Sequence, residues 1–206
     1  MEKLLPMLIL ASASTTRKAL LDKAGLRFEA KPAELDERQV ENQALEAGGD
    51  ARDVALLLAR HKAEAVSSSR PGDLVIGADQ TLALGLELLH KPASRAEAVA
   101  QLDHLRGKTH RLHAAVTLVR DGHLLWSDLQ TAELTMRDFS AEERDHVLDL
   151  EGEASLGSVG GYRLEGPSIR LFETVAGDYF TILGLPLLPL LAALRDIAPD
   201  LLSARN

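Results

Sequence analysis

The stretch LASASTTRKALL, residues 10–21, gathers hydroxyl and cationic side chains where an apolar run gives way to a helical pattern. If Ser14 caps that helix, the backbone N–H groups of residues 15–17 are unpaired and carry the positive end of the helix dipole. Phosphate is stabilised at such a position, and the guanidinium of Arg17 is suited to phosphate oxygens. A Ser or Thr cap is also common in helices that bind nothing, so an ordinary cap and an anion pocket both stay open.

An acidic side chain ends the buried strand expected over LVIGAD, residues 74–79. Sheets of α/β proteins place ligands at the carboxyl ends of their strands. Asp79 at this position is suited to bind a divalent cation or to accept a proton from water, and the structural alternative is a turn aspartate. The Asp-x-Asp-x-Thr motif of haloacid dehalogenase phosphatases is excluded, because Gly77 stands where that mechanism needs a carboxylate.

Two lysines are candidate phosphate ligands. In LLARHKAEAV, Arg60 and Lys62 lie about 200° apart around the helix expected over residues 50–69, so they face different ways. Lys62 is expected beside the inward apolar stripe and Arg60 in solvent, although a solvated helix face would explain either one. Lys91 lies in an extended segment that Pro92 fixes.

Composition limits the classes of function. A net charge of −8 argues against general nucleic-acid binding, and 3% aromatic residues offer few platforms for stacking bases. No apolar run reaches the roughly 18–20 residues that span a bilayer, so no membrane partner is expected. The opening MEKLLPMLILASAS leads directly into a helical pattern, and we interpret MLILA as a strand and not as a signal peptide. The absence of cysteine fits a reducing cytoplasm, where we expect the protein.

Strand and helix patterns alternate along the 206 residues. Apolar runs bounded by turn residues predict strands, and capping residues before apolar residues at helical spacing predict helices. The expected strands are 7–11, 27–30, 74–79, 109–120, 124–136 and 169–175, with a hairpin turn at Asp121-Gly122. One expected helix ends before Gly25, two cover residues 50–69 and 185–197, and two begin at the capping boxes 94–97 and 140–143. Residues 32–50 are expected to form a loop or a loose helix.

This order predicts an α/β protein with a mixed, twisted sheet and flanking helices, folded as one domain over residues 1–206. Two lobes, with a boundary near residues 90–107 and the site in the cleft between them, are an alternative that the sequence leaves open.

These motifs together resemble the Maf family of nucleoside triphosphate pyrophosphatases, also called septum formation inhibitors. The resemblance runs from about residue 8 to residue 195. The resemblance rests on the order and spacing of the motifs together, because each motif alone is weak. The matching segments are LASAS with Arg17, LDE (35–37), ARHKAEAV, VIGAD, HKP (90–92) and GLPLLPLL.

The resemblance implies hydrolysis at the α–β phosphoanhydride, giving a nucleoside monophosphate and pyrophosphate with the help of Mg²⁺ or Mn²⁺. It implies that Glu37 and Asp79 serve the metal and the water, with Asp79 as the catalytic proton acceptor. A nucleoside triphosphate is the expected partner, and a homodimer is an open possibility. The residues implied to hold the triphosphate are Ser12, Ser14, Arg17, Lys62 and Lys91.

Three positions bear on the choice of base. The branch of the family that acts on dTTP and UTP usually has arginine, threonine and glutamine where this sequence has Thr16, Gln80 and Glu165. Glu165, in YRLEG, resembles the branch acting on 7-methyl-GTP, although that branch commonly carries an aromatic residue at the position of Thr16. A carboxylate accepts from a guanine-type N–H edge or attracts a cationic methylated base.

Other functions stay open at this point. One alternative is a dTTP- or UTP-preferring pyrophosphatase, and another is a non-catalytic nucleotide sensor or division regulator on the same fold. A third is a phosphatase that releases single phosphates. Glu37, Lys62 and Asp79 together argue against the sensor, because a binding protein has no need of a metal and water constellation.

Overall fold

The computed structural model describes residues 6–203 and packs them into two compact units. Residues 1–5 and 204–206 lie outside the described part. Residues 1–5 begin the stretch MEKLLPMLILASAS, for which a signal peptide was rejected above. The first unit contains the described residues up to Gln80, Ala114–Gln130 and those from Tyr179 onward; the second contains Thr81–His113 and Thr131–Asp178. The segment near residues 90–107, considered above as a boundary, lies wholly within the second unit.

The secondary structure is that of an α/β protein with a mixed sheet, as predicted. The strands pair in the order β2-β1-β3-β5-β6-β7, with β4 also paired to β3. Strand β1 is parallel to β2 and β3, whereas the β3–β4 and β6–β7 pairs are antiparallel. The strands are β1 (Leu8–Leu10), β2 (Glu29–Ala30), β3 (Leu74–Leu84), β4 (Glu87–Leu89), β5 (Thr109–Arg120), β6 (His123–Met136) and β7 (Phe172–Ala176).

The helices follow the expected pattern, with three additions among the described residues. Residues 32–50 contain a regular helix, α2, and two short helices, α6 and α8, precede and follow the predicted closing helix. The helices are α1 (Thr15–Lys23), α2 (Glu37–Glu46), α3 (Ala51–Ser67), α4 (Arg95–Leu105), α5 (Ala141–Glu151), α6 (Tyr179–Ile182), α7 (Leu187–Ile197) and α8 (Pro199–Ser203); three 3₁₀ segments cover Gly152–Gly157, Val159–Gly161 and Pro167–Leu171.

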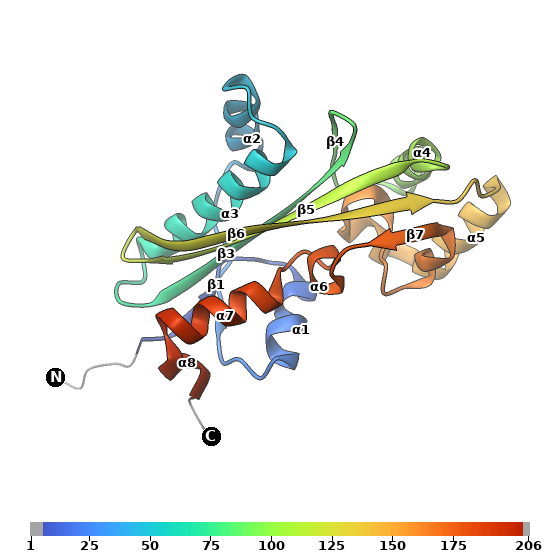
Figure 1. The fold of residues 1–206 in the computed structure, drawn as a ribbon. Helices are drawn as coiled ribbons and strands as arrows, with labels where there is room; N and C mark the ends of the chain where they lie inside the picture. The colour runs from blue at the N-terminus through green and yellow to red at the C-terminus, as the bar shows by residue number, and fades with distance from the viewer. Residues whose placement is uncertain (1–5, 204–206) are drawn as a thin grey trace. The chain divides into compact units, whose positions relative to one another are not determined.

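Both faces of the parallel strands in the first unit are buried. Leu8 and Leu10 pack in one apolar cluster with residues of α1 and α7, while Ile9 points to the other face and packs with Ala63 and Val66 of α3. Figure 1 shows α3 on one side of these strands and α1 and α7 on the other. Side chains alternate along a strand, so successive residues of β1 and β3 face different helices.

A glycine in β3 lets α3 come unusually close to the sheet. A Cβ atom added to Gly77 would lie 1.9 Å from the carbonyl oxygen of Ala59 and 2.8 Å from Cβ of Ala63. Any other side chain at this position would therefore collide with the backbone of α3. Glycine at position 77 therefore allows the short distance between α3 and β3.

Local capping signals are mostly confirmed. Asp50 and Asp53 form a complete capping box at the start of α3. Ser94 and Ser140 cap α4 and α5 as predicted, but Glu97 bonds to the N–H of Ala93 and not to that of its cap residue. The Asp121-Gly122 turn has positive φ at both residues, 52° and 74°, as a tight hairpin requires.

The second unit contains a long irregular segment between α5 and β7. The strand expected over residues 169–175 begins only at Phe172, because Pro167–Leu171 forms a 3₁₀ turn. The ring of Tyr162 packs edge-on against Phe172, with 5.0 Å between centroids, and its hydroxyl bonds to Nε2 of the buried His110 at 2.7 Å. This aromatic cluster anchors the irregular segment to β5 and β7.

Candidate active site

The ammonium group of Lys62 lies between two carboxylates in the first unit. Its Nζ atom is 2.5 Å from Oδ1 of Asp79 and 2.9 Å from Oε1 of Glu37. The side chains of Lys62 and Asp79 are about one-tenth exposed, whereas that of Glu37 is 57% exposed. Three residues predicted from separate motifs therefore meet at one point.

Three elements bring these groups together. Positions 75, 77 and 79 of β3 share the strand face toward α3, so Asp79 follows Gly77 where helix and strand come closest. Lys62 belongs to the buried stripe of α3, and Arg60 points away into an ion pair with Glu64, as predicted.

The third group comes from the start of α2. Asp36 caps α2 by accepting from the N–H of Gln39, and Glu37 is the first residue of the helix. Its carboxylate is favoured there by the positive end of the helix dipole.

Arg17 is buried and holds three segments of the first unit together. Its Nε donates to the carbonyl oxygen of Gly184 at 2.7 Å, and its Nη1 donates to the carbonyl of Ala78 at 2.9 Å and to Oγ of Ser12 at 3.2 Å. Nη2 donates to no acceptor among the residues that the structure describes. The arginine predicted to hold phosphate is thus also a structural clamp.

The site is electrostatically balanced. Burial lowers the pKa of Arg17, and the negative charges of Asp79 and Glu37 act in the opposite direction. An arginine stays protonated under such a shift, so the site holds two cations, Arg17 and Lys62, against two carboxylates. These four groups therefore add no net negative charge, although the chain as a whole carries −8.

The start of α1 forms the predicted cap but leaves fewer open donors than expected. Oγ of Ser14 accepts from the N–H of Arg17, and Oγ of Ser12 accepts from the N–H of Ser14. Of the three N–H groups expected to be unpaired, that of Arg17 is therefore occupied. The N–H groups of Thr15 and Thr16 have no acceptor within residues 6–203 and stay available to an anion.

Two of the positions expected to read the base lie in the first unit. Thr16 is half-buried in the first turn of α1. Gln80 uses both amide hydrogens on the backbone, because its Nε2 donates to the carbonyls of Thr181 and Ile182 at 3.0 Å each. Gln80 therefore holds α6 in place, and only its oxygen is left for a ligand.

Lys91 and Glu165 lie in the second unit and are both exposed. Lys91 follows β4 in a segment without regular secondary structure. Glu165 lies in a turn between two 3₁₀ segments. The structure thus brings Ser12, Ser14, Arg17, Lys62, Asp79 and Glu37 into one unit, with Lys91 and Glu165 in the other.

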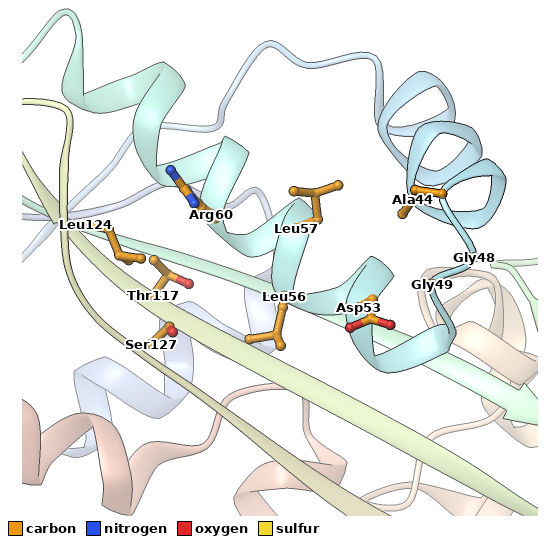
Figure 2. A pocket seen from close by; sticks show the side chains of 11 residues that line it. Ala44, Gly48, Gly49, Asp53, Leu56, Leu57, Arg60, Thr117, Leu124 and Ser127 are labelled. Atoms are coloured by element: carbon orange, nitrogen blue, oxygen red, sulfur yellow. The ribbon is translucent and has the colours of Figure 1, made fainter.

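A separate cavity of about 580 Å³ lies in the first unit, on another face of α3. Figure 2 shows Leu56, Thr117 and Ser127 at its floor, with the end of α2 to one side. None of the predicted site residues lines it. The lining residues are Ala44, Ala47, Gly48, Gly49, Asp53, Leu56, Leu57, Arg60, Thr117, Leu124 and Ser127.

The sequence analysis missed several backbone groups that organise the site. The carbonyls of Ala78 and Gly184 hold the Arg17 guanidinium, and no local pattern identifies a carbonyl as a partner. From the sequence, Gly77 served only to exclude a phosphatase motif. A glycine within an otherwise apolar strand is itself a signal of close backbone approach.

The strand expected over residues 74–79 is longer, because β3 runs from Leu74 to Leu84, and Asp79 therefore lies inside the strand and neither at its carboxyl end nor in a turn. The cations of Arg17 and Lys62 and the carboxylates of Glu37 and Asp79 are gathered in the first unit of an α/β protein. Residues 7–197 match the family model described as Maf-like protein. The chain belongs to the Maf family.

Two relatives support this assignment. The chain is 53% identical over 192 residues to the 7-methyl-GTP pyrophosphatase of Rhizobium johnstonii, covering 93% of this chain and 96% of the relative. It is 55% identical over 189 residues to the nucleoside triphosphate pyrophosphatase of Bradyrhizobium diazoefficiens, covering 92% and 93%.

Two features of the described residues bear on the predicted membrane and metal partners. No helix within residues 6–203 is both long and apolar enough to cross a membrane. No group of three or more His, Cys, Asp or Glu side chains in this range is arranged to hold a metal ion without further ligands.

Proposed function

We propose that the protein hydrolyses nucleoside triphosphates between the α- and β-phosphates, releasing a nucleoside monophosphate and pyrophosphate. The observation that carries the proposal is the Lys62 ammonium between Glu37 and Asp79 in the unit that also holds Arg17. Phosphoryl transfer depends mainly on positioning and charge neutralisation, which such a cluster provides. The names of the two relatives agree with this reaction.

The triphosphate takes over donors that are open or shared in the structure. Its oxygens accept from the N–H groups of Thr15 and Thr16, from Nη2 of Arg17 and from Lys62. When Lys62 donates to phosphate, its ion pair with Asp79 weakens and that carboxylate becomes free to act as a base. Lys91 is proposed as a further cation that binds the triphosphate.

The chemical step then uses Asp79 as the proton acceptor. A water oxygen attacks the α-phosphorus, and one of the water protons passes to the Asp79 carboxylate. The new P–O bond forms as the anhydride P–O bond breaks, and pyrophosphate leaves with the electron pair of that bond. Arg17 and Lys62 stabilise the negative charge on the phosphate oxygens.

The residues present fit a divalent cation that the substrate helps to bind. Glu37 and Asp79 place two carboxylate oxygens around one point, the position of the Lys62 ammonium. Mg²⁺ is commonly held by one or two carboxylates plus substrate phosphates, so two protein ligands suffice. Held by Glu37, Asp79 and the triphosphate, Mg²⁺ or Mn²⁺ would neutralise charge on the phosphate oxygens.

We further propose that Glu165 favours a guanine-type or methylated, cationic base such as that of 7-methyl-GTP. A carboxylate accepts from N–H donors and attracts a positive ring, but it is repelled by the carbonyl oxygens of uracil and thymine. Several relatives carry the name 7-methyl-GTP pyrophosphatase, among them that of Brucella suis, 52% identical over 188 residues. A dTTP- or UTP-preferring enzyme is the competing proposal.

The same proposal places the enzyme in the cytoplasm with its nucleotide substrate, as a monomer or a homodimer. Light scattering on the purified protein distinguishes these two assemblies.

Product analysis tests the reaction. The purified protein is incubated with 7-methyl-GTP, GTP, dTTP and UTP, each with Mg²⁺ or Mn²⁺, and pyrophosphate and orthophosphate are quantified. We expect pyrophosphate with the largest kcat/KM for 7-methyl-GTP, and product formation slower by on the order of a hundredfold or more with Asp79→Asn. Release of orthophosphate alone would identify a phosphatase, and binding without product would identify a sensor or regulator. A preference for dTTP or UTP would contradict the role given to Glu165.

A further inference from the structure

A buried carboxylate lies directly behind the turn that carries Glu165. The side chain of Glu151, the last residue of α5, is 0% exposed. Its Oε2 accepts from Nε and Nη2 of Arg163, both at 2.8 Å. Its Oε1 accepts from the backbone N–H of Ser168 at 3.0 Å and from the Ser168 hydroxyl at 2.9 Å. Both oxygens are therefore fully used by residues on either side of the turn.

The turn itself is packed against this carboxylate. A Cβ atom added to Gly166 would lie 2.4 Å from Oε1 of Glu151 and 3.0 Å from Oε2. The N–H of Gly166 donates to the carbonyl of Arg163, and its own carbonyl accepts from Ile169. Residues 163–169 thus form two consecutive turns that meet at Gly166, with Glu151 behind them.

Glu165 lies within the first of these turns and points into solvent. Its side chain is exposed, and among residues 6–203 it takes part in none of the hydrogen bonds that hold the turn. The fixed groups around it are Arg163 on one side and Gly166 and Ser168 on the other. The position of the Glu165 backbone is therefore set by the Glu151 carboxylate.

Stability alone is a weak reason for a buried ion pair at this place, because well-packed apolar residues often serve as well. What the pair provides is a specific geometry, since a carboxylate that receives four hydrogen bonds from both flanks of a turn admits few alternative conformations. A binding group gains discrimination from such pre-organisation.

We propose that Glu151 is a positioning residue that fixes the turn 163–168 and thereby sets the base preference expressed through Glu165. The inference rests on the proposed function, because it takes Glu165 as the residue that reads the base. Glu151 itself is buried and acts only through the turn.

Glu151→Gln tests the inference with the smallest change of shape. All four groups that face the carboxylate are donors, and an amide offers one oxygen and turns two hydrogens toward the others. The ratio of kcat/KM for 7-methyl-GTP to kcat/KM for UTP should fall about tenfold or more, since an ångström of misplacement can cost about a hundredfold in rate. A merely structural role would lower the values for both substrates together.

Asp103→Asn is the matched control. Asp103 pairs with Arg144 between α4 and α5 of the same unit and touches no part of the turn. This variant should lose stability but keep the wild-type substrate ratio. If Glu151→Gln fails to fold, Ser168→Ala removes one of the four hydrogen bonds and should shift the ratio in the same direction by a few fold.

A double-variant comparison separates this inference from the proposed function. In the Glu165→Gln background, Glu151→Gln should have no further effect on the ratio, because it acts through Glu165. A ratio that is unchanged by Glu151→Gln and by Ser168→Ala, while Glu165→Gln alters it, overturns the inference and leaves the proposed function standing. A ratio unchanged by Glu165→Gln itself contradicts the proposed reading of the base. A Glu151 effect that persists without Glu165 overturns the positioning role.

Discussion

Replacing Arg17 by alanine should damage both the fold and the activity. Arg17 is 9% exposed, and its guanidinium makes three hydrogen bonds, to the carbonyls of Gly184 and Ala78 and to the hydroxyl of Ser12. An arginine that only binds phosphate could be replaced with little change in Tm. Arg17 also links α1 to β3 and to the segment before α7, so we expect its loss to lower Tm.

The size of the effect follows from the buried groups left behind. Each buried acceptor that loses its donor costs about 1–3 kcal/mol, while removal of the desolvated guanidinium returns part of that cost. A net loss of about 2–4 kcal/mol is expected for Arg17→Ala. For a chain of this length each kcal/mol corresponds to about 2–4 °C, so Tm should fall by about 5–15 °C. Arg17→Lys keeps the charge but lacks the planar fork, and it should recover only a small part of this loss.

Thermal unfolding followed by circular dichroism and steady-state hydrolysis of 7-methyl-GTP measure the two effects in the same samples. Below Tm, kcat/KM should also fall by about ten- to a hundredfold, as loss of a charge-assisted phosphate contact implies. Lys18→Ala is the control, because this neighbouring side chain is not among the groups assigned to the site. An Arg17→Ala protein that melts within about 2 °C of the wild type would refute the clamp. Lower Tm with unchanged kcat/KM would refute the phosphate contact.

Three further predictions follow from groups near the site and in the second unit. Asp79→Asn should fold and lower kcat by on the order of a hundredfold or more, and near-normal turnover in a protein with a native circular dichroism spectrum would contradict its role as base. Gly77→Ala should cost about 3 kcal/mol or more in urea unfolding, because its Cβ would lie 1.9 Å from the carbonyl of Ala59; an unchanged unfolding midpoint would show that α3 adjusts freely. Burial lowers the pKa of His110 to about 4. Between about pH 6.5 and 4 the unfolded chain therefore binds more protons than the folded chain, so the free energy of unfolding falls as the pH is lowered. The loss should reach about 2 kcal/mol at pH 5, relative to the full stability above pH 6.5. Unfolding of wild type and His110→Gln at pH 7 and 5 checks this, and equal losses in both would exclude His110 as the cause.

The sequence predicted features that depend on neighbouring residues. The Ser14 cap, the capping box at Asp50 and the Asp121-Gly122 turn are all local signals, and the structure confirms them. The inward orientation of Lys62 also follows from helical period, because it shares a stripe with the apolar residues of α3. These elements were predictable because the residues that decide them lie within a few positions of one another.

The contacts that the sequence did not predict join distant parts of the chain. Arg17 meets the carbonyl of Gly184, 167 positions away, and nothing near either residue signals the other. Gln80 was expected to face the base, but its amide hydrogens are held by the backbone at Thr181 and Ile182. Such bonds arise only when the segments pack, so they depend on the whole unit and not on local propensity.

The division of the chain into two units has an evolutionary consequence. Glu37, Lys62 and Asp79 belong to one compact unit, and Glu165 with its support Glu151 belongs to a continuous segment, 131–178, of the other. Substitutions in that segment alter a separately packed body, and the apolar residues of β1, α3 and β3 that pack together on the α3 face all lie outside it. With the roles proposed above, substitutions within this one segment, about a quarter of the chain, can change the nucleotide preference of a descendant of an ancestral pyrophosphatase. The residues that cleave the anhydride stay unchanged.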